Sequence, residues 1–269
     1  MRKAGEQART YDREFLARRG LDLDVAFQCV ELAWLAYREP ALADERARGQ
    51  LGYDLCRHVT RRQGRDHALV VRDRHRTIVA FRGSDDLWDW LTNLRAWTAV
   101  TPYGRVHRGY YGVLQSLADE LRAVLVDDAR RRPVVLTGHS MGGALAVVAG
   151  LLLTEAGSKP GGIYTFGQPQ VGDHHFSRSF SERYPARLFR FVNGADAIAA
   201  WTYGRRAMLG TPCYFDKRGY LVFGDHFSEV PRLGLRFHRL DHYRHYLRLN
   251  RLRLRIRDES DSTTVLVDR

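Results

Sequence analysis

Residues 133–146 read PVVLTGHSMGGALA, an apolar run followed by a glycine-bounded turn and a series of small residues. A continuous apolar run of this kind is typical of a strand buried in the middle of a parallel sheet. The small residues Gly143, Ala144 and Ala146 favour a helix that lies close to that strand. The stretch therefore predicts a strand, a sharp turn and a helix that begins near Met141.

Further predicted elements extend from this unit in both directions. Apolar residues spaced by three to four predict a helix over residues 22–38 and another over 113–125. Short apolar and β-branched runs predict strands that begin at residues 68, 77, 162 and 188, and a hairpin over 213–223. Strands interleaved with helices predict an α/β fold, a mostly parallel, doubly wound sheet with helices on both faces and antiparallel pairs at its edges.

The chain has 269 residues and contains no linker rich in proline, glycine or serine. We therefore expect one domain over residues 1–269, with flexible termini at 1–20 and 258–269. Residues 251–257 alternate arginine with leucine or isoleucine. This period of two predicts a strand, read either as an edge strand blunted by charge or as a basic stripe that meets anionic lipid headgroups.

Composition limits the location and the cofactors. The formal net charge is +12, which either attracts the protein to anionic surfaces or reflects arginine-rich codon usage. The first 20 residues lack the apolar core of a secretory signal, and the apolar stretch inside 144–153 is too short to span a bilayer. We expect a cytoplasmic protein that can make peripheral contact with an anionic membrane or a lipid droplet surface, and signal-independent secretion is the alternative. Three widely spaced cysteines indicate neither a disulfide framework nor a metal site, and no nucleic-acid motif accompanies the arginines.

The turn at Gly138-His139-Ser140-Met141-Gly142 fits the pattern G-x-S-x-G between a strand and a helix. In this setting Ser140 is the candidate nucleophile. Serine needs a base to remove its proton and an acid to orient that base, and in this architecture both follow the nucleophile in the chain. Asp196 follows the strand-like run that starts at residue 188 and is the preferred acid. Asp173, which fits a turn former, is the rival.

Four histidines follow Asp196, and their spacing alone does not separate them: His226, His238, His242 and His245. We select His242 as the predicted base because it immediately precedes the last apolar stretch. A tetrahedral intermediate also needs backbone N–H donors for its oxyanion. Met141, the residue after the nucleophile, and Ser84, which follows a strand and a glycine turn, are the predicted donors.

Several segments, in order, resemble the fungal-type (class 3) lipases of the α/β-hydrolase fold. The segments are 81-FRGS, 85-DDLWDWLTNL, 106-VHRGYYGVL, 136-LTGHSMGGALA and 165-TFGQPQVGD, and the resemblance runs from about Leu32 to Tyr246. It implies a serine carboxylic-ester hydrolase without cofactor, with Ser140, Asp196 and His242 as the triad and Ser84 and Met141 as the oxyanion hole.

The resemblance also implies a lid over the site, formed around Leu87, Trp88, Trp90 and Leu91, although the same residues fit an ordinary packed helix. We expect a triacylglycerol lipase-like enzyme acting on a lipid or small ester. A phospholipase A1, a short-chain or feruloyl-type esterase and a catalytically silent lipid-binding scaffold are the alternatives. The sequence leaves the acyl-chain length, the headgroup preference and the oligomeric state open.

Overall fold

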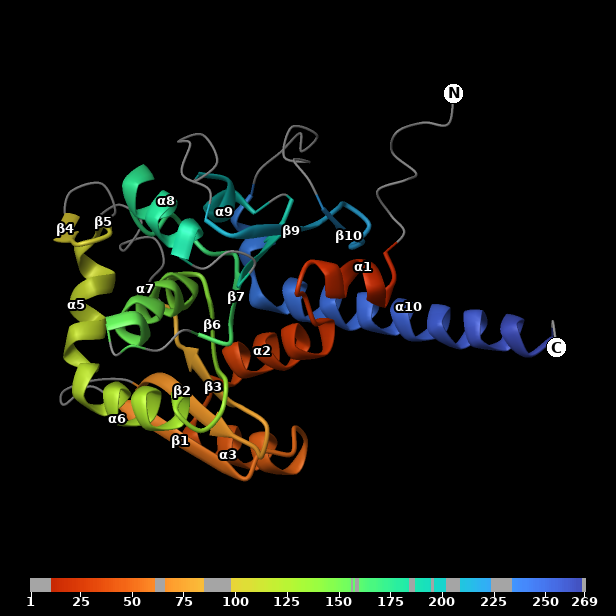
Figure 1. Ribbon diagram of the computed structural model, residues 1–269, viewed down its shortest axis with the longest axis horizontal. Coiled ribbons are helices and arrows are strands. Elements are labelled where there is room, and N and C mark those ends of the chain that lie inside the picture. Colours follow the sequence, from red (N-terminus) through yellow and green to blue (C-terminus); the bar gives the residue numbers. More distant parts are fainter. Residues whose placement is uncertain are drawn as a thin grey trace.

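The computed structural model describes residues 11–60, 66–84, 98–155, 157, 160–183, 187–194, 196–201, 209–223 and 234–267 (Figure 1). An eight-stranded sheet forms the centre in the order β1-β2-β3-β6-β7-β8-β9-β10. Its strands are β1 (Leu55–Thr60), β2 (Asp66–Arg72), β3 (Thr77–Phe81), β6 (Val134–His139), β7 (Gly162–Phe166), β8 (Leu188–Asn193), β9 (Thr211–Phe215) and β10 (Leu221–Val222). A separate hairpin pairs β4 (Thr98–Thr101) with β5 (Gly104–His107).

The five strands from β3 to β9 run parallel, and the edge strands β1, β2 and β10 join them in antiparallel pairs. This confirms the mostly parallel sheet with antiparallel edges that the sequence predicts. The register places Gly138 of β6 opposite Phe81 of β3 and Thr165 of β7. The carboxyl ends of the central strands therefore meet at one edge, where open α/β sheets bind their ligands.

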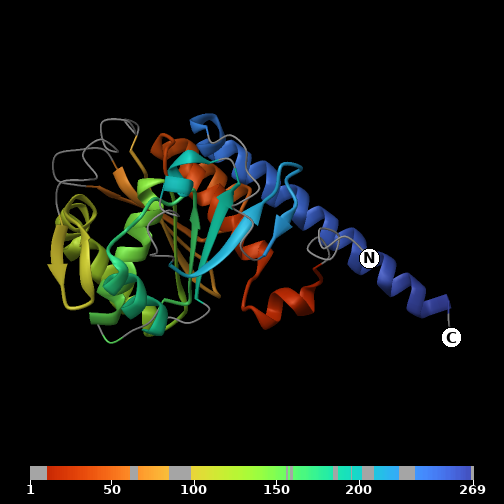
Figure 2. The same ribbon diagram turned by 90° about the horizontal axis from the view of Figure 1, so that it is seen from above.

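Helices cover both faces of the sheet, which Figure 2 shows from above. One face is covered by α2 (Leu23–Leu35) and α10 (Leu240–Val267), and the other by α5 (Arg108–Ser116), α6 (Ala118–Ala129) and α7 (Met141–Glu155). The remaining helices are α1 (Arg13–Arg18), α3 (Pro40–Gly49), α8 (His174–Arg183), α9 (Ala197–Trp201) and the short 3₁₀ turn η4 (Leu235–His238). The α/β-hydrolase architecture is therefore confirmed.

The alternation of side chains along the strands divides the interior into two apolar clusters. Val71 and Ile78 face the cluster under α2 and α10, whereas Val70 and Val79 face the cluster under α7. All four side chains are completely buried, and both sides of the sheet are apolar because neither faces water. The two helical layers therefore hold the sheet, and with it the site, from opposite sides.

The chain after residue 240 forms the helix α10 and not the predicted strand. The alternation of arginine with leucine over 251–257 is local, whereas Tyr243, Leu247, Asn250 and Leu254 recur at the helical spacing of three to four and are all buried. Asn250 fixes this helix, since its side chain accepts hydrogen bonds from the Tyr11 hydroxyl and the Leu221 N–H and donates to Gly219 O. Helical backbone also occupies parts of both termini that the sequence suggested to be flexible.

Candidate active site

The turn between β6 and α7 holds Ser140 in a backbone conformation that L-residues rarely adopt. Its φ is 56°, and Ser140 is the only described residue other than glycine with a positive φ. The neighbouring glycines make this turn tight: a Cβ at Gly138 would collide with the backbone of Gly142, and one at Gly142 would collide with Phe81 O. Strain of this kind concentrates at functional sites. The turn presents Ser140 at the N-terminus of α7.

The strand β7 brings Ser140 and two distant residues to the same place. The Ser140 N–H donates to Phe166 O at 2.9 Å. The next residue, Gly167, has a φ of 59°, and a Cβ added there would lie 2.8 Å from Asp196 Oδ2 and 2.9 Å from His238 Nδ1. The backbone of Phe166 and Gly167 therefore joins the serine turn to a carboxylate and an imidazole.

Asp196 and His238 form a buried pair, with 2.8 Å between Asp196 Oδ2 and His238 Nδ1. The Tyr243 hydroxyl donates to the same carboxylate oxygen at 2.5 Å, and the Ile198 and Ala199 amides donate to Oδ1. Burial alone would raise the pKa of Asp196, but the charge of His238 and these hydrogen bonds outweigh it and hold the pKa below its ordinary value. The carboxylate is thus ionised and fixed in orientation.

The histidine beside Asp196 is His238 and not the predicted His242. His242 lies in the first turn of α10, half-buried against the rings of Phe237 and Tyr246. His238 ends the 3₁₀ turn η4, so it precedes α10 and can reach the edge of the sheet. His245 is exposed on α10, and His226 lies outside the described residues.

The rival carboxylate, Asp173, lies at the start of α8. Its Oδ1 accepts a hydrogen bond from the Phe176 N–H at 2.8 Å, which is the geometry of a helix N-cap. The structure therefore brings Ser140 together with Asp196 and not with Asp173.

His139, the residue before Ser140, supports the backbone of His238. Its Nε2 lies 2.7 Å from His238 O, so Nε2–H donates to that carbonyl, and the two imidazole rings are 4.6 Å apart. The Tyr37 hydroxyl lies 3.4 Å from His139 Nδ1. Burial, together with the nearby charge of His238, lowers the pKa of His139 to about 3. His139 is therefore neutral at any ordinary pH and acts as a fixed hydrogen-bond donor.

The two predicted oxyanion donors lie on adjacent elements at this edge. Met141 is the first residue of α7, where backbone N–H groups have no partner within the helix. Ser84 is half-buried and lies three residues after the end of β3. The residue before it, Gly83, lies against the Tyr37 hydroxyl and His139 O, and a Cβ at Gly83 would collide with both. The predicted lid residues Leu87, Trp88, Trp90 and Leu91 lie outside the described residues.

Two polar atoms at the centre of the site are buried and make no hydrogen bond with the described part of the chain: Ser140 Oγ and His238 Nε2. One is a hydroxyl that can lose a proton, and the other is the free nitrogen of an imidazole whose Nδ1 is held by a carboxylate. Hydrogen bonds of this kind are often long in unliganded enzymes. The described residues contain no group of three or more potential metal ligands. The arrangement is suited to nucleophilic acyl transfer.

Sequence reasoning named Ser140 and Asp196 but did not assign His238, His139, Gly167 or Tyr243 to the site. The sequence does contain a pattern that singles out His238. His242 and His245 fall within the helical repeat of Tyr243, Leu247 and Asn250, which leaves His238 as the histidine just before the helix.

Comparison with known proteins finds similarity to lipases. Residues 78–204 match the family model described as lipase (class 3). The secreted mono- and diacylglycerol lipase 1 of Fusarium solani is 31% identical over 140 residues, which are 49% of this chain and 41% of that protein. Phospholipase A1-II 1 of Oryza sativa subsp. indica is 26% identical over 212 residues, 67% of this chain and 52% of the relative. The chain thus spans about half of the length of these relatives.

A solved structure, the Rhizomucor miehei triacylglyceride lipase, superposes with a TM-score of 0.61 at 19% identity, covering 85% of this chain and 94% of the other. At 19% identity the superposition shows that the two proteins share a fold. The matched residues 78–204 contain the turn around Ser140, the strand β7 and Asp196. Through this segment the chain resembles the class 3 lipases.

Proposed function

We propose that the protein is a serine carboxylic-ester hydrolase that cleaves lipid esters of the glyceride type through an acyl-enzyme. The observation that carries the proposal is the meeting of three elements around Gly167: the strained Ser140 turn, the Asp196 carboxylate and the His238 imidazole. The match of residues 78–204 to a lipase family model and the glyceride lipases among the relatives support the substrate class. No step requires a metal or an organic cofactor.

In the proposed mechanism His238 Nε2 removes the proton from Ser140 Oγ as that oxygen attacks the ester carbonyl. Asp196 keeps the second nitrogen, Nδ1, protonated and stabilises the imidazolium that forms. The amides of Met141 and Ser84 hold the oxyanion, and removal of one such donor typically costs about 100-fold to 1000-fold in turnover. The imidazolium then protonates the leaving alcohol. Water activated by the same histidine releases the acyl group.

Phospholipase A1 activity is the second candidate. The rice relative carries that name and matches 67% of this chain. A strongly basic surface would also favour anionic phospholipid over neutral glyceride, because the formal net charge is +12. The two candidates use the same catalytic groups and differ in the preferred headgroup.

The decisive experiment measures hydrolysis of a soluble short-chain ester, a triacylglycerol emulsion and anionic phospholipid vesicles by the wild type and Ser140→Ala. We expect the variant to lose all three activities and its labelling by a fluorophosphonate probe, with unchanged circular dichroism. Retained turnover in the purified variant would refute the nucleophile. Turnover of the soluble ester alone would point to an esterase. A wild type that shows neither turnover of any substrate nor labelling by the probe would point to the non-enzymatic scaffold.

A peripheral contact with a lipid surface and a location in the cytoplasm complete the proposal. No helix among the described ranges combines the length and the apolar character that a membrane crossing needs. The Fusarium relative is named as secreted, so fractionation of cells and medium is the test of location.

A further inference from the structure

The outer side of α10 carries a row of exposed side chains, which we call the α10 ridge: His245, Arg248, Leu252, Arg255 and Ile256. Spacings of three and four residues place them on one face of the helix. Leu252 and Ile256 are 54% and 58% exposed. Among the described residues, the only other large hydrophobic side chain this exposed is Val100, on β4, which lies at the far side of the molecule from α10 (Figure 1).

The ridge is positively charged. Residues 242–257 contain six arginines and no acidic residue. The inward arginines are neutralised, since Arg244 pairs with Glu31 at 2.7 Å and Arg251 pairs with Asp24. Arg255 also pairs with Asp24, at the longer distance of 3.8 Å, but its side chain is 58% exposed. Arg248 is exposed, with its guanidinium 5.9 Å from the Phe27 ring, and has no carboxylate within ion-pair distance in the described part of the chain.

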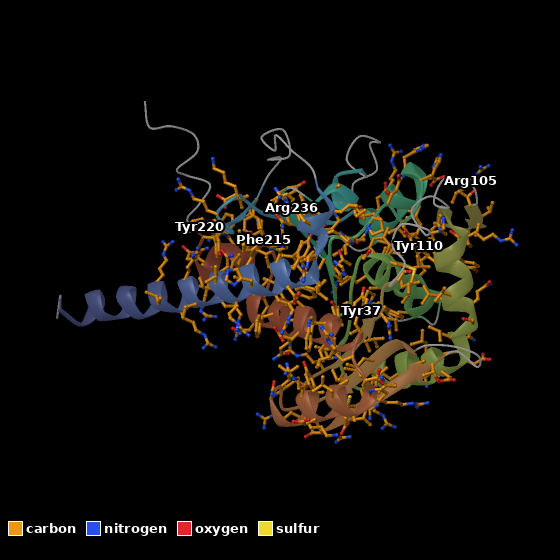
Figure 3. All side chains as sticks on the ribbon, turned by 180° about the vertical axis from the view of Figure 1, so that it is seen from behind. Tyr37, Arg105, Tyr110, Phe215, Tyr220 and Arg236 are labelled. Carbon is orange, nitrogen blue, oxygen red and sulfur yellow. The ribbon has the colours of Figure 1, made fainter. Side chains whose placement is uncertain are left out.

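The shape of the molecule leaves the ridge accessible. The helix α10 packs on α2 along its first half and then projects beyond the body, as Figure 1 shows; in Figure 3, seen from behind, it runs across the front. Tyr220 stacks under the Arg253 guanidinium on the inner side, so that arginine is directed toward the body and not toward the ridge. The outward groups are thus two apolar side chains flanked by two cations.

We propose that the α10 ridge docks the protein on an anionic phospholipid bilayer, with Leu252 and Ile256 entering the interface and Arg248 and Arg255 meeting lipid phosphates. Apolar side chains between arginines on one helix face are the pattern of helices that lie in a membrane interface. Charge complementarity favours the bilayer over a second copy of the chain, because a second copy would bring the same cations against the ridge. This proposal rests on the peripheral lipid contact proposed above and assigns that contact to the α10 ridge.

The test measures binding of the full chain to vesicles of phosphatidylcholine with one-third phosphatidylglycerol and to vesicles of phosphatidylcholine alone, by co-sedimentation. Using Ser140→Ala as the parent prevents hydrolysis, so the result does not depend on the proposed activity. We expect tighter binding to the anionic vesicles, weakened by salt. Arg248→Gln with Arg255→Gln should lower the affinity about 30-fold, which corresponds to about 1 kcal/mol for each arginine.

The matched control removes two exposed arginines elsewhere, Arg130→Gln with Arg131→Gln at the end of α6. This pair should lose less than about three-fold, since it changes the net charge equally but not the ridge. Leu252→Gln with Ile256→Gln should lose about 10-fold or more through reduced apolar burial. These positions are exposed, so the fold should persist by circular dichroism.

Two results would overturn the proposal. Equal losses in the ridge and control arginine pairs would mean that only the overall charge matters. A wild type that is dimeric by light scattering and becomes monomeric in the Leu252→Gln, Ile256→Gln variant, with unchanged vesicle affinity, would assign the ridge to a second copy. Either outcome leaves the proposed hydrolase activity untouched, since that activity is read from a soluble ester.

Discussion

Acid should destabilise the protein through His139, and replacing this residue with glutamine should remove the effect. His139 has a pKa of about 3 in the folded protein, against an ordinary value of 6.5. Below pH 6.5 the unfolded chain therefore binds a proton that the folded protein does not, and the free energy of unfolding falls as the pH falls. At pH 5 the solution is about 1.5 units below the pKa of the unfolded chain. At 1.36 kcal/mol for each unit, His139 lowers the free energy of unfolding by about 2 kcal/mol.

The pKa of Asp196 is also lowered, but its effect falls in a different window. A carboxylate whose folded pKa is depressed loses its stabilising contribution only as the pH falls below its unfolded value of 3.8. Between pH 8 and pH 5 Asp196 therefore adds no slope. The difference between the wild type and the variant over this range isolates His139.

The assay is urea unfolding of the wild type and His139→Gln at several pH values from 8 to 5. Glutamine can keep an N–H near His238 O, and it does not titrate. We expect the wild type to lose about 2 kcal/mol more than the variant over this range, whatever the difference in stability at pH 8. Parallel curves for the two proteins would refute the argument that His139 is buried in its neutral form.

Three further predictions concern the site and the last helix. His238→Gln should lower kcat on a soluble ester by at least about 1000-fold, and His242→Gln should stay within about two-fold; equal losses would contradict the assignment. Gly167→Ala should lower kcat about 100-fold, because its Cβ would press on Asp196 and His238, and a fully active variant would speak against this contact. Asn250→Ala should cost about 2–4 kcal/mol in urea unfolding by leaving buried backbone groups unpaired; a loss under about 0.5 kcal/mol would contradict the role described above.

The central part of the fold could be predicted from the sequence because its signals are local and agree with one another. The run 133–146 contains the buried strand, the turn and the helix in one continuous segment. The tail 251–257 could not be assigned in the same way. Its alternation is compatible with a strand over seven residues, and only the buried repeat upstream, with Asn250 bound to the distant Tyr11, selects the helix.

The site shows the same division between local and long-range information. Ser140 and the two glycines of its turn follow from sterics within five residues. The choice of His238 over His242 depends on where α10 begins, and this helix packs on α2, a segment far away in the sequence. The contact of Gly167 with the acid and base is visible only once three strands lie side by side.

The packing of α10 on α2 joins segments more than 200 residues apart in the chain. During synthesis α2 and the strands beneath it leave the ribosome long before their cover exists. A nascent chain interrupted before residue 240 would lack Tyr243, whose ring packs against Phe166 and Phe215, and both of these rings are fully enclosed in the finished protein. Such an intermediate is prone to aggregate. Truncation within the last helix should therefore harm the yield of folded protein far more than the number of residues removed suggests.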